Sequence, residues 1–427
     1  MGIKEANIYL DNQFNAYYAG QTVNGRIEYV FDSPKKVRGI HVKIKGEAHT
    51  EWAESTQKED SQGKTESTDT LHTGHEEYFQ VSYYLLGSNT GNEIEIPAGK
   101  HVYNFTCALP PVLPSSFEGQ HGHIRYTVKV VIDRPWKFDQ ETKMAFTVIN
   151  AFDLNLNPSY KEPIHIQMEK TFCCFCCASP PLSIDVRAPV SGYCPGQVIP
   201  IKVDVENKSN VQVHLVKIFI RKVVTYRATS PSNATKKTKD IVLTIQEGPA
   251  PAGSTKTWNL TLEVPPIPPS DLVNCNIIDL DYDFKVECTV SGLHLGLSGK
   301  KYIAIGTVPL VGMAGQALPS APASPGNEQY SPSQPAVLPV GPGQPAQPNV
   351  PSDPSAPGGW VMPGAAPVQP PFQTLYPTLT EPVYKESPYT ARTIQERGES
   401  NHVVIRGPNF APYYPTYAAV QPPPLPQ

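Results

Sequence analysis

Several features that mark other protein classes are missing from this sequence. No apolar run approaches the roughly 20 residues that a membrane-spanning helix needs, and residues 1–7 lack the apolar core of a signal peptide. Charged residues make up only 17% of the chain and the net charge is -4, so bulk charge does not favour nucleic-acid binding. No glycine-rich phosphate loop follows an expected strand. We therefore expect a cytoplasmic protein that binds no nucleic acid and no cofactor.

Catalytic constellations are missing as well. His101, His121 and His123 lie close together in the sequence, but no Ser or Cys nucleophile motif accompanies them. Histidines that lie on the surface or pack in the core explain this pattern without a catalytic role. The sequence predicts a protein that is not an enzyme.

The eight cysteines are unevenly placed, because four of them crowd into one short segment: Cys173, Cys174, Cys176 and Cys177. In a reducing compartment, free thiols are the default. Two adjacent pairs separated by one residue are poorly spaced to wrap one metal ion, since zinc sites use separated pairs, so we expect no metal here. S-acylation, which would bring this segment to a membrane, and thiols without a special role both remain open.

What the chain does contain is a block that occurs twice, over residues 96–136 and 251–290. Each copy has a Pro-Ala-Gly turn, a strand, a Pro-Pro pair and a second strand in which apolar and polar residues alternate. Alternation with a period of two indicates a half-buried strand. The alternating apolar positions are Ile124, Tyr126, Val128, Val130 and Ile132 in the first copy, and Ile278, Leu280, Tyr282, Phe284 and Val286 in the second. Matching elements in a fixed order indicate a duplication.

The expected fold is all-β, with two tandem immunoglobulin-like β-sandwich domains, because strands recur at sandwich spacing without a helical period. We place the first domain at 1–157, a connector with the cysteine cluster at 158–181, and the second domain at 182–312. Residues 53–77 are polar, and we expect a long mobile hairpin loop there.

The composition changes after Pro309, and more than half of the 47 prolines lie beyond Val308. Residues 313–427 are therefore expected to form a disordered tail without a core of its own. Tyrosines spaced among its prolines are typical of ligands for aromatic-lined grooves.

Several motifs together resemble the alpha-arrestins, the arrestin domain-containing proteins. They are Tyr-Tyr-Ala-Gly-Gln-Thr-Val-Asn-Gly at 17–25, Ile-Pro-Ala-Gly-Lys-His at 96–101, Leu-Pro-Ser-Ser-Phe-Glu-Gly at 113–119, Ile-Arg-Tyr at 124–126, Asp-Arg-Pro-Trp at 133–136, Gly-Tyr-Cys-Pro-Gly-Gln at 192–197 and Ile-Gly-Thr-Val-Pro-Leu at 305–310. The resemblance covers residues 5–312 and implies two arrestin sandwiches packed end to end. It also implies an adaptor that holds membrane cargo, such as receptors and transporters, and recruits WW-domain ubiquitin ligases of the HECT type.

The tail departs from the family's pattern, because no Pro-Pro-x-Tyr motif occurs in the chain. The nearest segments lack the first proline and provide Pro382 with Tyr384 and Pro412 with Tyr414. A WW groove clamps that proline, so its loss weakens each motif. Several weak motifs in one tail can still act together.

One expected sheet face of the first domain is basic. The residues concerned are His41, Lys43, Lys45, Arg125 and Lys129. Such a patch suits an acidic or phosphorylated cargo segment, or anionic lipid. A solvated sheet face with cross-strand pairs explains the same pattern.

The sequence thus predicts a trafficking adaptor that links membrane cargo to ubiquitin ligases and endosomal sorting. Such a protein is cytoplasmic, with peripheral association to the plasma membrane or endosomes. The alternative is a signalling scaffold that binds partners through its arrestin surface and recruits no ligase.

Overall fold

The computed structural model describes residues 3–59, 65–174 and 177–312, and beyond these 370, 372, 374–376, 379–389, 392–395, 399, 403–405 and 407–417. The side chains of 58, 59, 65, 66, 173, 174, 177 and 178 are not part of this description. Within the described ranges the only helical segments are two short 3-10 turns, η1 (Leu154–Leu156) and η2 (Pro158–Lys161). None of the described helices is long and apolar enough to cross a membrane.

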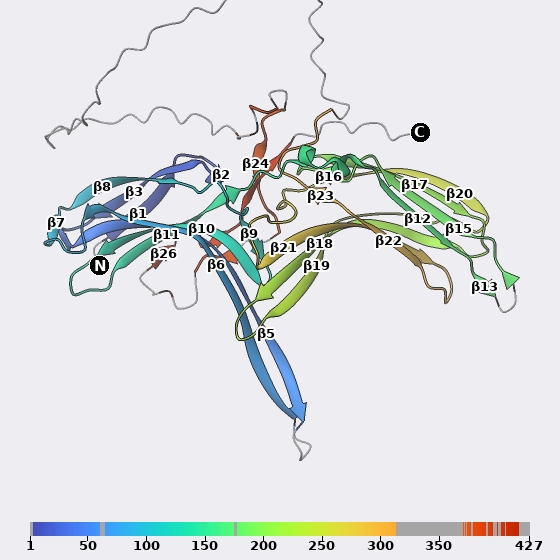
Figure 1. Cartoon of the computed structure of the whole chain (residues 1–427), viewed down its shortest axis with the longest axis horizontal. Coiled ribbons are helices and arrows are strands. Elements are labelled where there is room, and N and C mark those ends of the chain that lie inside the picture. The colour runs from blue at the N-terminus through green and yellow to red at the C-terminus, as the bar shows by residue number, and fades with distance from the viewer. Residues whose placement is uncertain are drawn as a thin grey trace, which may run out of the picture. The chain divides into compact units, whose positions relative to one another are not determined.

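The first sandwich packs two main sheets against each other (Figure 1). One sheet has the order β1 (Ile3–Leu10), β3 (Thr22–Phe31), β8 (Gly99–Ala108). The other has the order β2 (Ala16–Tyr18), β11 (Gln140–Ile149), β10 (Gly122–Asp133), β5 (Gly39–Glu59), β6 (Thr65–Gly87), with β9 (Phe117–Gly119) beside β10. A separate pair joins β4 (Lys35–Val37) and β7 (Ile94–Ile96). Alternate residues of β3 are buried, as the period-two pattern predicts, whereas β10 is buried on both faces along nearly all of its length.

The polar segment 53–77 forms the expected hairpin, but the prediction of a mobile loop is wrong for its described residues. Its described residues continue β5 and β6 as a long antiparallel ribbon, in which Glu51 pairs with Thr73 and Ser55 with Asp69. Backbone pairing orders these strands although most of their side chains face solvent. The base of the ribbon also contacts the second sandwich, since the Thr50 hydroxyl donates to the Arg227 carbonyl at 2.7 Å.

The second sandwich has two four-stranded sheets. Their orders are β12 (Ile164–Lys170), β15 (Leu182–Ala188), β17 (Val198–Asn207), β20 (Ser254–Glu263), and β19 (Ala234–Glu247), β18 (Val213–Ala228), β21 (Ile278–Val290), β22 (Leu297–Tyr302). Short pairs join β13 (Cys173–Cys174) to β14 (Cys177–Ala178) and β16 (Gly192–Tyr193) to β23 (Ala304–Ile305). Strand β12 lies within the stretch expected to be a connector and instead forms the edge of this sandwich. The all-β fold with two tandem sandwiches is confirmed.

The duplication is visible in atomic detail. Gly20 and Gly196 both have a φ of 85°, a conformation that glycine adopts without strain. After each, a glutamine side chain accepts a backbone N–H three residues back, from Tyr18 to Gln21 at 2.8 Å and from Cys194 to Gln197 at 2.7 Å.

The two tyrosines that follow the Pro-Pro pairs also play matching roles. The Tyr126 hydroxyl donates to the Pro114 carbonyl at 2.7 Å, and the Tyr282 hydroxyl donates to the Pro268 carbonyl at 2.8 Å. Each bond ties the central strand of its sandwich to the loop that follows the Pro-Pro pair. The two blocks are therefore repeated in geometry as well as in sequence.

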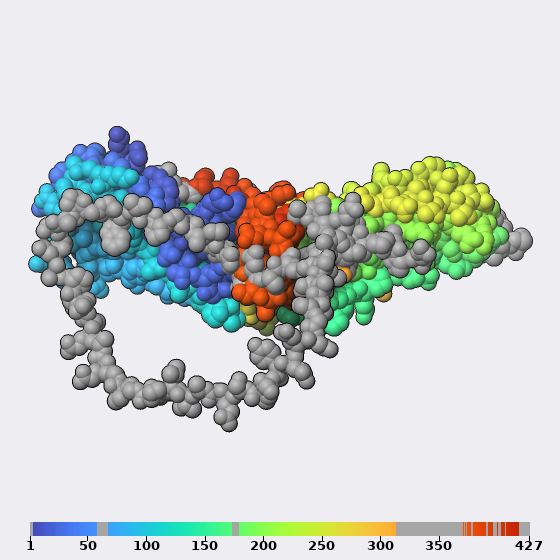
Figure 2. Space-filling view, turned by 90° about the horizontal axis from the view of Figure 1, so that it is seen from above, coloured from blue at the N-terminus to red at the C-terminus, as the bar shows by residue number. Residues whose placement is uncertain are grey.

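The described residues of the tail form short strands. Strand β24 (Val383–Glu386) pairs with β28 (Tyr413–Thr416), β25 (Arg392–Thr393) pairs with β27 (Asn409–Phe410), and β26 (Val403–Ile405) extends the first sandwich beside β11. In Figure 2 these residues, in orange and red, lie between the blue and the yellow parts of the same unit. They form no core of their own, as the composition predicts, but they are ordered by packing on both sandwiches. The Tyr417 hydroxyl, for example, donates to the Thr307 carbonyl at 2.6 Å.

Candidate protein-binding site

Three lysines lie directly opposite one another on adjacent strands of the first sandwich. Lys129 of β10 is in register with Lys43 of β5 on one side and with Lys143 of β11 on the other. Residues in register on neighbouring strands point to the same face of the sheet. Lys43, Lys129 and Lys143 therefore form a lysine row across the sheet.

The tail covers one end of the lysine row. The Lys143 ammonium is only 1% exposed, donates to the Ile394 carbonyl at 3.1 Å, and lies 2.9 Å from the Glu399 carboxylate. The same carboxylate lies 3.3 Å from Lys129, whose other partner is Glu141 at 2.9 Å. The chain thus places a glutamate of its own tail on its basic sheet face.

The carboxylates around Lys129 alter its protonation. Desolvation is the largest single influence and lowers the pKa of Lys129, but the hydrogen bonds and charges of Glu141 and Glu399 outweigh it, so the pKa is raised. Lys129 therefore stays charged at physiological pH.

Three other residues of the predicted basic patch are less available. Lys45 pairs with Glu47 at 2.6 Å, and partial burial lowers the pKa of His41. Arg125 is a correction, because its side chain is buried rather than on the exposed face and binds both carboxylate oxygens of Glu118 at 2.8 Å. Desolvation raises the pKa of Glu118 although Arg125 opposes it.

The two tyrosine-proline segments come together in the structure. Strands β24 and β28 pair so that Tyr384 is opposite Pro415 and Lys385 is opposite Tyr414. The Tyr414 side chain is only 2% exposed, and its hydroxyl donates to the Ser116 carbonyl at 3.0 Å. A WW domain that binds Tyr414 therefore requires this ribbon to detach.

Tyr384 and both prolines are held in the same ribbon. The Tyr384 ring lies 5.6 Å from Phe14, and its hydroxyl is 3.3 Å from that of Tyr18. Pro412 is buried and Pro382 is half-buried. These four residues remain a prediction for WW binding.

The cysteine cluster is only partly described. Cys173, Cys174 and Cys177 have their backbone in the β13–β14 hairpin, whereas Cys176 and the side chains of all four lie outside the described residues. Cys107, Cys194, Cys275 and Cys288 are free thiols. Among the residues that the structure describes, no group of three or more metal-ligating side chains is found.

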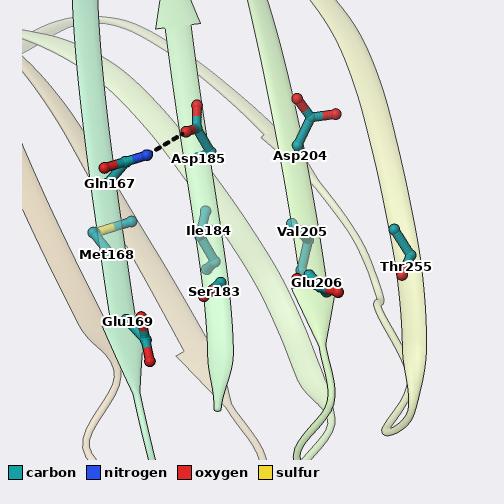
Figure 3. Close-up of a pocket in the computed structure, with 10 residues that line it drawn as sticks. All are labelled: Gln167, Met168, Glu169, Ser183, Ile184, Asp185, Asp204, Val205, Glu206 and Thr255. Carbon is teal, nitrogen blue, oxygen red and sulfur yellow. Dashed lines mark hydrogen bonds between the residues drawn. The ribbon is translucent and has the colours of Figure 1, made fainter.

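A second charged surface lies on the sheet of β12, β15, β17 and β20. A depression of about 360 Å³ is bordered there by Glu169, Asp185, Asp204 and Glu206 (Figure 3). Burial alone raises the pKa of Asp185, but hydrogen bonds from Arg187, His165 and Gln167 outweigh it and the pKa is lowered. Nearby lysines pair with Asp204 at 3.2 Å and with Glu206 at 2.7 Å. This face is thus largely neutralised by its own strands.

Comparisons with known proteins agree with the architecture. Residues 6–155 match the model of the arrestin (or S-antigen) N-terminal domain, and residues 178–310 match that of the C-terminal domain. Arrestin domain-containing protein 17 of Caenorhabditis elegans is 32% identical over 317 residues, which cover 71% of this chain and 70% of the relative. Arrestin domain-containing protein 4 of Homo sapiens is 32% identical over 309 residues, 71% of each chain. Thioredoxin-interacting protein of Homo sapiens is 29% identical over 298 residues, 68% of this chain and 71% of the relative.

Proposed function

Because the chain belongs to the arrestin domain-containing (alpha-arrestin) family, we propose that it is a trafficking adaptor that binds the acidic cytoplasmic segments of membrane cargo. The bound cargo is then passed to ubiquitin ligases and endosomal sorting. The observation that supports this is the lysine row, where Lys129 and Lys143 hold the tail's Glu399. That geometry fits an extended acidic segment running beside β11.

In this proposal, cargo and tail compete for one sheet face. Strand β26 occupies the hydrogen-bonding edge of β11, with Val404 opposite Thr142 and Ile405 opposite Lys143. A cargo segment that adds a strand there would gain the same backbone hydrogen bonds. Its carboxylates or phosphates would pair with the lysine row more strongly than the single glutamate does. The trigger for binding is therefore a high local density of negative charge.

The test is a titration of the full chain with a fluorescent acidic cytoplasmic-tail peptide. The variant Lys129→Glu should weaken binding by roughly tenfold or more, since it replaces an attraction with a repulsion. The control Lys301→Glu makes the same charge change at an exposed position on β22 of the second sandwich. Equal losses in the two variants would mean that bulk charge, and not the lysine row, governs binding.

The second candidate function is a scaffold that recruits no ligase. It is favoured by the burial of Tyr414 and by the absence of a Pro-Pro-x-Tyr motif from the sequence. A peptide of residues 375–420 titrated against isolated WW domains separates the two. Micromolar binding that is lost with Tyr384→Ala and Tyr414→Ala supports the adaptor, whereas no binding at high concentration supports the scaffold.

A further inference from the structure

A turn joins β10 to β11 (Figure 1), and two aromatic side chains of this turn are exposed to solvent. Trp136 is 99% exposed and Phe138 is 77% exposed. Single exposed apolar residues are normal on protein surfaces, but a fully exposed Trp beside an exposed Phe is unusual, since both rings bury large areas when they can. We call residues 134–139 the aromatic turn.

The aromatic turn is held in this form by polar contacts at its base. The Arg134 side chain donates from Nε to the Phe138 carbonyl at 3.0 Å, and its backbone N–H donates to the Asp139 carboxylate at 3.2 Å. Arg38 binds the Asp133 carboxylate through Nε at 2.9 Å and Nη2 at 2.6 Å.

The backbone conformation of Trp136 is also unusual. Its φ is 57°, a left-handed conformation that is rare and unfavourable for a bulky L residue. The turn is therefore held in an unfavourable backbone conformation in which both rings are exposed.

The charges around the two rings are mainly cationic, and Asp139 at the end of the turn is the exposed acidic exception. A shallow depression of about 640 Å³ at the aromatic turn is lined by Arg38, Arg134, Trp136, Lys137 and Phe138, with no acidic residue among them. The carboxylate of Asp133 is engaged by Arg38, and Lys36 is a further exposed cation two residues before Arg38. Protein surfaces that lie in a membrane interface typically combine exposed aromatic rings with Arg and Lys side chains.

We propose that the aromatic turn is a membrane-docking element that inserts Trp136 and Phe138 into the interface of a bilayer carrying anionic lipid. Lys137 and the neighbouring arginines would pair with lipid headgroups, while the rings reach the acyl boundary. This surface is separate from the lysine row, and docking does not require cargo.

The experiment is sedimentation of the full chain with vesicles of phosphatidylcholine, with and without phosphatidylserine, in the absence of cargo. Binding is expected with phosphatidylserine and should fall as salt rises. The double variant Trp136→Ser with Phe138→Ser should lose roughly tenfold or more of that binding. The matched control is Val112→Ser with Leu156→Ser, two residues that are 64% and 79% exposed elsewhere on the chain.

A second readout reports insertion directly. The chain has four tryptophans, so the emission of Trp136 is obtained as the difference between the wild type and Trp136→Phe. That difference spectrum should shift to shorter wavelength with phosphatidylserine vesicles, and Lys137→Glu should reduce the shift. Vesicle binding that is unchanged in the double variant, or a Trp136 emission that stays that of a water-exposed ring, would overturn the proposal.

Discussion

The carboxylate of Glu399 lies 2.9 Å from the ammonium group of Lys143, a residue more than 250 positions earlier in the chain whose side chain is 1% exposed. A buried lysine is stable only when its charge is compensated. The tail therefore supplies a carboxylate and a carbonyl that pair with Lys143 across about 250 residues of sequence.

Removing the charge of Glu399 should loosen the tail. In the variant Glu399→Gln, Lys129 and Lys143 lose a shared carboxylate, so β26 should open more often from β11. Amide hydrogen exchange at residues 403–405 should become at least several-fold faster. The matched control is Glu386→Gln on exposed β24, which should leave this exchange unchanged. Equal protection in the two variants would show that Glu399 does not hold the tail.

The repeated glycine turns offer a second test. A Cβ at Gly196 would lie 2.1 Å from the Tyr417 carbonyl oxygen, whereas a Cβ at Gly20 meets Pro111 at an ordinary 3.6 Å. Both glycines have a φ of 85°, so Gly20→Ala and Gly196→Ala share a backbone cost of about 1–3 kcal/mol. Gly196→Ala alone should also displace residues 413–417.

Thermal unfolding and limited proteolysis distinguish the two alanine variants. We expect similar losses of stability in both sandwiches, together with faster cleavage of the tail in Gly196→Ala only. A tail that is cut at the same rate in both variants would contradict the packing of Tyr417 against the Gly196 turn.

The stability should fall in mild acid. Desolvation lowers the pKa of His123 well below 6.5, with smaller contributions from Arg125 and His49. Below about pH 6.5 His123 is therefore protonated in the unfolded chain but not in the folded chain. The contribution of His123 to the free energy of unfolding is complete above the usual histidine pKa and declines as the pH drops below it. One such group contributes a slope of at most about 1.4 kcal/mol per pH unit.

Denaturant unfolding between about pH 7 and pH 5 measures this slope. The variant His123→Gln should flatten it, and His101→Gln, at an exposed ring that contacts the Pro97 carbonyl, should not. The same slope in the wild type and in His123→Gln would assign the acid sensitivity to other groups.

A variant of the Tyr414 hydroxyl can test whether the tail binds WW domains without disturbing the fold of the sandwiches. Tyr414→Phe removes one buried hydrogen bond to the Ser116 carbonyl and leaves the ring in place. It should cost about 1–2 kcal/mol of tail docking and expose the ribbon more often. If the ribbon carries WW motifs, the binding of a WW domain to the full chain should rise, whereas Tyr384→Phe in a weaker 3.3 Å contact should change little. A fall in WW binding in Tyr414→Phe would mean that the hydroxyl is part of the motif.

The sandwiches could be predicted from the sequence because the patterns that define their strands and turns lie within short segments. Alternating residues such as Val128 and Val130 define strands, and the doubled Gly-Gln turns and Pro-Pro blocks reveal the duplication. The ribbon of β5 and β6 could not be predicted, since its polar residues carry no burial pattern and cross-strand backbone bonds decide the outcome. Charge alone likewise misplaced Arg125, because the sequence does not show that Glu118 meets it inside the fold.

The candidate site could likewise be predicted only in part from the sequence. Lys43 and Lys129 stand at alternating positions of two expected strands, and Lys143 is the first residue of a third expected strand. The lysine row was therefore predictable from the register of these strands. The position of Glu399 was not, because it follows from a contact across more than 250 residues between a proline-rich tail and a sheet. Long-range contacts of this kind leave no period in the sequence.

The most direct test of the account is the affinity of one acidic cargo peptide for the full chain and for a chain that ends at residue 312. If tail and cargo compete for the lysine row, the shortened chain should bind the peptide roughly tenfold more tightly, and Lys129→Glu should remove that gain. Equal affinity for both chains, or a gain that survives Lys129→Glu, would contradict it.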